Sequence, residues 1–261
     1  MSELLFEVRE SVATITLNRP EKRNAFTTEM LLAWAAALEE SQQRDDVRAI
    51  VLTGAGSAFC AGGDVGTLKD RGELGTLARK NSLFERVHRI PRAMAAIDKP
   101  VLVAVNGVAT GAGMDMALMG DIRVAGASAR FAESYVRMGI VPGDGGAWFL
   151  PRIVGMSRAL ELLWTGRFVD AEEAARIGLV MEVVPDARLM EHTLDLARRI
   201  AAGPPVAIRM TKRAARQGMA MDLETHLDQI SSHMAVAYGT EDHKEAVQAF
   251  LEKRPPVFTG R

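Results

Sequence analysis

Three short glycine-rich stretches of this chain each carry one carboxylate. They read AGGD (residues 61–64), TGAGMD (residues 110–115) and GDGG (residues 143–146). Small residues let the backbone come close to a ligand, and a backbone N–H can stabilise an oxygen that gains negative charge in a reaction. A carboxylate nearby can take or give a proton. Together the stretches favour an acid–base site that holds an oxyanion with backbone N–H groups.

The first two stretches each supply one candidate N–H donor. Gly63 offers one within AGGD, and Ala112 offers another where TGAG opens the apolar run MDMALM. If that run is a helix, its first N–H groups are unpaired and lie at the positive end of the helix dipole. Each stretch also has a purely structural explanation. AGGD could form a tight turn in which Asp64 caps the next helix. TGAG could be a glycine-rich contact between a helix and a strand. The residues alone leave these alternatives open.

Asp115 and Asp144 are the candidate acid–base residues. Asp115 follows the second donor loop closely enough to reach the same end of a substrate. Asp144 comes from a different loop, GIVPGDGG (residues 139–146), and could approach from another side. Its alternative role is that of a turn or N-cap residue before the helical stretch AWFLPRIVG.

Other site chemistries fit the sequence poorly. A dinucleotide fingerprint would begin at Gly54 and Gly56, but its third small residue falls on Phe59. Cys60 has no evident His partner and is better explained as a small loop residue than as a nucleophile. No metal site is predicted, because the five histidines lack metal-ligand spacing: His88, His192, His226, His233 and His243.

The elements that must position the loops follow from hydrophobic patterning. VATITL (Val12–Leu17) alternates as a strand does, and AIVLTG (Ala49–Gly54) and VLVAVNG (Val101–Gly107) are apolar runs typical of strands buried on both faces. A helical stretch covers roughly Leu83–Ile97, and a third strand–loop cycle begins at Asp121. Repeated strand, small loop and helix predict an α/β fold with right-handed crossovers and with ligands beyond the strand ends.

From about residue 187 the pattern is helical only. We divide the chain into a ligand-binding core, residues 1–200, and a helical C-terminal region for oligomerisation, residues 201–261. Apolar faces on these helices suit contact with other subunits, although packing onto the core explains them equally well.

Composition limits the classes of partner. The net charge is −1 and aromatic residues make up 5% of the 261 residues, which argues against nucleic-acid binding. No run of about 18 apolar residues predicts a membrane span, and the N-terminal residues do not resemble a targeting signal. One cysteine fits a reducing compartment, so we expect a cytoplasmic protein.

Together these motifs resemble the crotonase, or enoyl-CoA hydratase/isomerase, superfamily along nearly the whole chain. The series is LNRPEKRNAF, VLTGAGSAFCAGGD, KPVLVAVNGVATGAG, ALMGDIRVA, GIVPGDGG, GLVMEVV and AFLEKRPPVFTGR, in the family's order and spacing. The resemblance implies a spiral core of ββα units, a C-terminal trimerisation region, and homotrimers or homohexamers.

The resemblance also implies an acyl-CoA thioester as substrate, with no cofactor besides that coenzyme A. The oxyanion-hole amides would be those of Gly63 and Ala112, holding the thioester oxygen as it becomes an enolate. The implied CoA contacts lie in three segments of the chain: Arg23 and Ala25; Ala61, Gly62, Gly63 and Asp64 with Ala112; and Phe250 with Lys253.

The acids depart from the family pattern. Asp115 stands at the first glutamate position of the family's hydratases, and Tyr135 stands at the second. Glu133, two residues earlier, would face the same way as Tyr135 if that segment were a strand. Asp144 is an additional acid, placed where some family hydrolases and isomerases carry one. Tyr135, with an ordinary pKa near 10, is expected to donate a hydrogen bond and not to act as a base.

The resulting hypothesis is an enzyme that hydrates a 2-enoyl-CoA, with Asp115 and Asp144 as the acid–base pair. The alternatives on the same fold are a double-bond isomerase and a carbon–carbon bond hydrolase. A protein of another class, non-catalytic or RNA-binding, is a further alternative because fold does not fix function.

Overall fold

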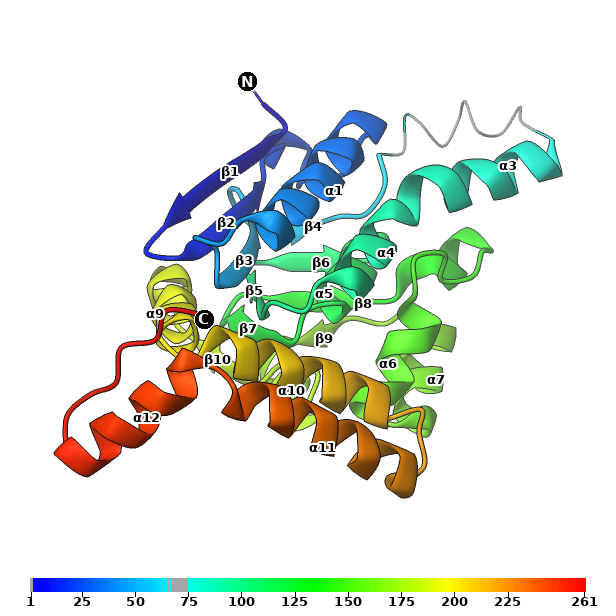
Figure 1. Cartoon of the computed structure of the whole chain (residues 1–261). Coiled ribbons are helices and arrows are strands. Elements are labelled where there is room, and N and C mark those ends of the chain that lie inside the picture. The colour runs from blue at the N-terminus through cyan, green and yellow to red at the C-terminus, as the bar shows by residue number, and fades with distance from the viewer. Residues whose placement is uncertain (1, 65, 67–74) are drawn as a thin grey trace.

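A computed structural model describes residues 2–64, 66 and 75–261 of the chain (Figure 1). Its main sheet has six strands in the order β1-β2-β3-β5-β7-β10. β1 pairs antiparallel with β2, and the remaining neighbours are parallel. The strands are β1 (Leu4–Arg9), β2 (Val12–Leu17), β3 (Ala49–Gly54), β5 (Val101–Val105), β7 (Ile122–Gly126) and β10 (Glu182–Val184).

A second sheet holds four short strands in the order β4-β6-β8-β9. β4, β6 and β8 are parallel, and β9 closes the sheet antiparallel to β8. β3, β5 and β7 of the main sheet are each followed by a short strand of the second sheet and then by helix, which agrees with the expected ββα spiral. The short strands are β4 (Ala58–Cys60), β6 (Val108–Thr110), β8 (Arg130–Ala132) and β9 (Val169–Asp170).

Helices cover both sheets and form the C-terminal part (Figure 1). The α-helices are α1 (Thr28–Gln43), α3 (Thr76–Ser82), α4 (Arg89–Ala96), α5 (Ala112–Leu118), α6 (Gly146–Val154), α7 (Met156–Thr165), α8 (Ala171–Arg176), α9 (Leu189–Ala201), α10 (Pro205–Gly218), α11 (Leu223–Tyr238) and α12 (Glu241–Glu252). Short helical turns are η1 (Pro20–Lys22), η2 (Leu83–Val87), η3 (Ser134–Met138) and η4 (Asp186–Arg188). No helix of the described residues has both the length and the apolar composition needed to cross a membrane.

β3 shows why the central strands read as continuous apolar runs. Ile50 and Leu52 pack into the main core, which also takes side chains from the second sheet and from α1, α4 and α5. Ala49 and Val51 lie in a second cluster, against α9. Because both faces are covered, no polar alternation remains in the strand.

Two predicted elements are shorter in the structure than the sequence suggested. The run Val101–Gly107 was expected to be one strand, but β5 ends at Val105 and β6 begins at Val108. Gly107 lies in the turn between them, where a Cβ would come 2.1 Å from the Ser57 carbonyl oxygen. The helix expected over Leu83–Ile97 is divided between η2, a π-helical turn, and α4.

Candidate active site

The two predicted donor loops lie side by side. Gly62 has φ +95°, and a Cβ there would come within 3.2 Å of the Thr110 carbonyl oxygen and 3.5 Å of the Ala112 nitrogen. Gly113 packs still more closely on the first loop, because a Cβ there would lie 2.1 Å from the Cys60 carbonyl oxygen. Side chains at these positions would force the loops apart, which explains the run of small residues in both.

The Gly63 N–H points away from the neighbouring chain segment. Phe26 forms an isolated parallel bridge here: its N–H donates to the Gly62 carbonyl at 2.9 Å, and its carbonyl accepts from the Asp64 N–H at 3.1 Å. Gly63 lies between Gly62 and Asp64. In a parallel bridge a residue in that position points its own N–H away from the paired strand, here away from Phe26. Within the described part of the chain, that N–H makes no hydrogen bond.

Ala112 is the first residue of α5, directly after Gly111 with φ +52°. Its N–H has no intrahelical acceptor at this position, and none from the other described residues either. Two N–H groups without acceptors thus lie in adjacent loops, which is the arrangement that an oxyanion hole requires.

Asp64 has a structural role at the end of the first loop. Its carboxylate accepts from the Gly66 N–H at 2.9 Å and forms an ion pair with Arg19 at 2.9 Å. These two contacts, the Gly66 hydrogen bond first, lower the pKa of the carboxyl below its ordinary value. Asp64 is therefore ionised and engaged in holding the loop, as the turn interpretation expected, and Gly66 is its backbone partner.

The segment before the first loop holds it through backbone contacts. Arg23, whose side chain is exposed and whose φ is +51°, accepts from the Ala61 N–H at 2.9 Å through its carbonyl. The Ala25 carbonyl accepts from the Arg19 guanidinium. Arg23, Ala25, Ala61 and Gly62 are thus brought together, and their contact with CoA stays a prediction.

The predicted acids converge on one hydroxyl. The Tyr135 oxygen lies 2.8 Å from Oδ2 of Asp115 and 2.8 Å from Oδ2 of Asp144. The Asp144 N–H also points to Oδ2 of Asp115, at 3.2 Å. Since the hydroxyl has one hydrogen, it donates to one aspartate at a time and can turn from one to the other. Asp115 is fully buried and Asp144 is 5% exposed, so the site is nearly closed to water.

Glu133 adds a third buried carboxyl. It follows β8 and precedes η3, so the segment is not a strand and the strand-based argument for its direction does not apply. The side chain is 1% exposed, and it lies beside Asp115: a Cβ on Gly146 would come 2.2 Å from Oδ1 of Asp115 and 2.8 Å from Oε1 of Glu133.

Burial and mutual repulsion set the protonation of this group. Burial, then the Asp144 charge, raises the pKa of Asp115 to about 6, while the Tyr135 hydroxyl and the Gly146 backbone act in the opposite direction. Burial, then the Asp115 charge, raises the pKa of Glu133 to about 10. Burial and the two aspartates also raise the pKa of Tyr135. At neutral pH Glu133 and Tyr135 therefore hold their protons and Asp115 is largely ionised.

Asp144 does not cap the following helix. The N-cap of α6 is Gly145 with φ +116°, and no side chain caps that helix. The carboxylate turns toward Tyr135 instead, which removes the N-cap alternative for Asp144. His88 holds the same loop through a contact of 2.7 Å between its Nε2 and the Gly143 carbonyl oxygen. His88 lies between η2 and α4, so this contact brings those two elements against the loop.

Three other predicted residues take no part in this cluster. The Cys60 thiol is buried and faces the Asn24 carbonyl at 3.1 Å, and burial raises its pKa to about 12, so it is no nucleophile. Phe250 and Lys253 lie at the end of α12, which projects away from the sheets (Figure 1). Within one chain they do not reach the donor loops, and their predicted contact with CoA requires another arrangement of the helices or another subunit.

Known proteins match the chain over its whole length. The model of the family described as enoyl-CoA hydratase/isomerase matches residues 7–261. The 1,2-epoxyphenylacetyl-CoA isomerase of Escherichia coli is 39% identical, with all of both chains covered. The short-chain-enoyl-CoA hydratase of Clostridium acetobutylicum is 38% identical over 97% of this chain and 96% of its own.

The fold agrees with that of solved relatives. The crystal structure of enoyl-CoA hydratase from Bacillus anthracis superposes with a TM-score of 0.92, at 34% identity, covering all of both chains. Full-length similarity in sequence and in structure, together with the paired donor loops and the adjacent acids, identifies this chain as an enzyme of the enoyl-CoA hydratase/isomerase family, the crotonase superfamily.

Proposed function

We propose that this enzyme adds water to a 2-enoyl-CoA through a thioester enolate. The N–H groups of Gly63 and Ala112 would hold the thioester oxygen as it becomes negative. Removing one such donor costs roughly 3 kcal/mol of transition-state stabilisation in enzymes. The lack of any other acceptor for these two N–H groups, within the described residues, supports this role.

The observation that carries the proposal is that three buried carboxyl groups, those of Asp115, Glu133 and Asp144, gather around the Tyr135 hydroxyl and Gly146. Hydration needs a base that takes a proton from water as its oxygen bonds to the β-carbon. It also needs an acid that gives a proton to the α-carbon of the enolate. Asp115, with a pKa of about 6, lies beside Glu133, with a pKa of about 10. Groups whose pKa values are pushed apart in one site are the usual source of such a division of roles.

Asp144 is the acid placed best to meet the substrate. It is the most exposed of the three carboxyls, although only to 5%, and the Tyr135 hydroxyl connects it to Asp115. In this arrangement Asp144 exchanges protons with the substrate or with water. Asp115 and Glu133 lie behind it and act on it through their charge and through the Tyr135 hydrogen bonds, without passing a proton.

Double-bond isomerisation is the second candidate, and the position of Tyr135 favours it. Its hydroxyl lies between Asp115 and Asp144, at 2.8 Å from each, where a water molecule bridging the two acids would otherwise lie. A single carboxylate, Asp144, could then carry one proton between two carbons of the acyl chain.

One experiment separates the two reactions. The enzyme is incubated with a series of enoyl-CoA thioesters in water labelled with heavy oxygen, and the product masses are read. Hydration predicts one labelled oxygen retained in a CoA thioester. A moved double bond without label supports isomerisation, and label in a free fragment indicates carbon–carbon bond hydrolysis. No turnover of any thioester, with intact fold, contradicts the proposal.

We also propose that residues 201–261 form the oligomerisation region of a homotrimer or homohexamer, beside a core of residues 1–200. α11 contains no buried residue in the single chain. Leu223, Phe250 and Leu251 are 71%, 83% and 69% exposed, and apolar surface of this kind is typical of an interface. Sedimentation that finds only a 28.3 kDa species at micromolar concentration would refute the assembly.

We also propose a cytoplasmic location. The buried, unpaired Cys60 is consistent with it.

A further inference from the structure

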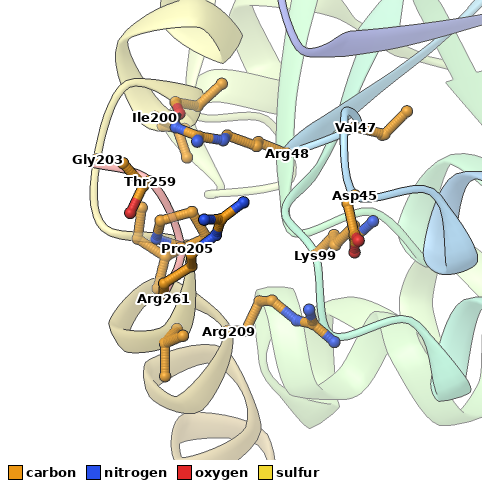
Figure 2. A pocket seen from close by; sticks show the side chains of 14 residues that line it. Asp45, Val47, Arg48, Lys99, Ile200, Gly203, Pro205, Arg209, Thr259 and Arg261 are labelled. Atoms are coloured by element: carbon orange, nitrogen blue, oxygen red, sulfur yellow. Dashed lines mark hydrogen bonds between the residues drawn. The ribbon is translucent and has the colours of Figure 1, made fainter. Parts of the chain in front are cut away.

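A cavity of about 220 Å³ lies between the beginnings of β3 and β5 and the start of α10 (Figure 2). Arg48 directly precedes β3 and Lys99 lies two residues before β5, so both line the cavity at the beginnings of strands. The donor loops follow β4 and β6, the short strands that come after β3 and β5. At about 3.3 Å per residue, a strand of six residues such as β3 puts the two sites about 20 Å apart, with the packed core between them.

The cavity gathers more positive than negative side chains. Arg48, Lys99, Arg209 and Arg261 line it, whereas Asp45 is its one acidic side chain among the described residues. Figure 2 shows Arg48 reaching toward Ile200 and Gly203, and Arg261 entering the same space from the other side. Like charges that converge in a partly enclosed space repel each other, and an anion between them relieves that repulsion.

Two of the four cations already have partners. Arg209 forms two hydrogen bonds to the Asp98 carboxylate, at 2.7 and 3.1 Å. Lys99 donates to the carbonyls of Ser41 and Arg44, at 2.8 and 2.6 Å, and is 4% exposed. Burial, then the charge of Arg209, lowers the pKa of Lys99 to about 8, while Asp45, Asp98 and Asp46 act in the opposite direction.

The other two arginines have unused donors. Arg48 makes one long contact, 3.4 Å, to the Ala201 carbonyl at the end of α9. Within the described residues, neither Arg48 nor Arg261 has a carboxylate at ion-pair distance. Guanidinium groups present paired donors that match the oxygens of a phosphate.

The start of α10 adds one backbone donor to the same cavity. Gly203, Pro205 and Val206 line it, but the Gly203 N–H donates to the Ile200 carbonyl at 3.0 Å and proline has no N–H. The Val206 N–H is left, and no side chain caps this 14-residue helix. The first N–H groups of a helix lack intrahelical acceptors and lie at its positive end, where phosphates bind in many proteins.

We propose that this cavity binds a phosphate or diphosphate group between Arg48, Arg261 and the start of α10. Its volume is below the roughly 300–1,000 Å³ of pockets that enclose a drug-sized ligand, so it holds the anionic group and not a whole nucleotide or CoA. The group could be free phosphate or the phosphate end of a larger molecule. This site is independent of the thioester site and of the reaction proposed above.

The test measures binding of inorganic pyrophosphate to the full-length enzyme by calorimetry and by thermal unfolding. Potassium chloride at the same ionic strength serves as the reference. We expect pyrophosphate to raise Tm beyond the chloride reference, and Arg48→Gln and Arg261→Gln each to weaken its binding by about tenfold or more. Arg158→Gln, an exposed arginine of α7, is the matched control and should change nothing.

Further arms separate the sources of the anion and the rival explanations. ADP that binds no more tightly than pyrophosphate supports a site for the phosphate group alone, and much tighter binding of ADP contradicts the size argument. Saturating acetyl-CoA should leave pyrophosphate binding unchanged, and displacement would place the anion in the thioester site and overturn the proposal. The proposal is also overturned if pyrophosphate raises Tm no more than chloride does. A third contrary outcome is that Arg48→Gln dissociates the oligomer. In that case Arg48 would bind an acidic side chain of another copy of the chain and not a phosphate.

Discussion

Gly146 packs its Cα directly against the carboxylate of Asp115. A Cβ at this position would lie 2.2 Å from Oδ1 of Asp115, a distance that no real contact allows. Oε1 of Glu133 lies 2.8 Å from the same point. The absence of a side chain at residue 146 is therefore what lets two carboxyl groups share one buried space at the start of α6.

Gly146→Ala tests this relationship. The methyl group must displace Asp115 or Glu133, and we expect kcat to fall by about a hundredfold because a small misplacement of catalytic groups is costly. Stability should fall by about 1–3 kcal/mol through overpacking. Gly75→Ala is the control, because no heavy atom lies within 4 Å of a Cβ there. Kinetics of Gly146→Ala equal to those of the control would show that the close packing has no catalytic importance.

Substitution of the acids tests their division of roles. We expect Asp115→Asn and Asp144→Asn each to lower turnover by about 10² to 10⁴-fold, with binding of a CoA thioester nearly unchanged. Tyr135→Phe should cost less, because it removes a hydrogen bond and not a proton carrier. Turnover and calorimetric binding are measured on the same preparations. Normal turnover of both Asn variants would refute the assignment and leave Glu133 as the next acid to test.

The raised pKa of Glu133 predicts a pH-dependent stability. The folded protein keeps this proton to a pKa of about 10, whereas the ordinary value is 4.5. Between these values the folded state binds one more proton than the unfolded chain. The free energy of unfolding therefore falls as the pH rises through this window, by about 1.4 kcal/mol per pH unit for this group.

Glu133→Gln removes that titration while keeping the volume. We measure the free energy of unfolding in urea at several pH values between about 5 and 9. The value for the variant should rise relative to that of the wild type as the pH rises. Glu172→Gln, at an exposed position, should follow the wild type throughout. If the curves for Glu133→Gln and wild type run parallel, Glu133 is ionised in the folded state.

Ala112→Pro tests the second oxyanion donor. Proline lacks the N–H but is tolerated at the first position of a helix, which is where Ala112 lies. We expect turnover to fall by about a hundredfold or more, and Ala112→Ser, which keeps the N–H, to lose less. Circular dichroism and Tm check that α5 still forms. A folded proline variant with near-normal turnover would exclude this N–H from the mechanism.

The donor loops could be predicted because their chemistry lies in the backbone. Small residues around Gly63 and Ala112 are visible in the sequence, and the strands before them fix which edge of the sheet they reach. The second sheet was not visible from the residues alone, because strands of three residues such as β4 and β6 carry too little periodic signal. It followed only from the resemblance to the family.

The geometry of the acids could not be derived in the same way. The direction of Glu133 depends on the helical turn η3 that follows it, and its contact with Asp115 depends on Gly146, which is distant from both in the sequence. The contact of His88 with the Gly143 carbonyl similarly depends on how η2 and α4 fold over the loop. Such contacts come from tertiary packing and have no local pattern. The positions of Phe250 and Lys253 relative to the CoA stay predictions.

The origin of the site from successive ββα units has an evolutionary consequence. The N–H groups proposed to hold the thioester oxygen belong to the main chain, so nearly every substitution at residues 63 and 112 preserves a donor, with proline as the exception. The proposed proton carriers are side chains, at residues 115, 133 and 144, and each can change by a single mutation while both donors remain. Under the proposed function, descendants of such a chain would keep the thioester-activating donors, while single mutations could change the reaction of the activated acyl group.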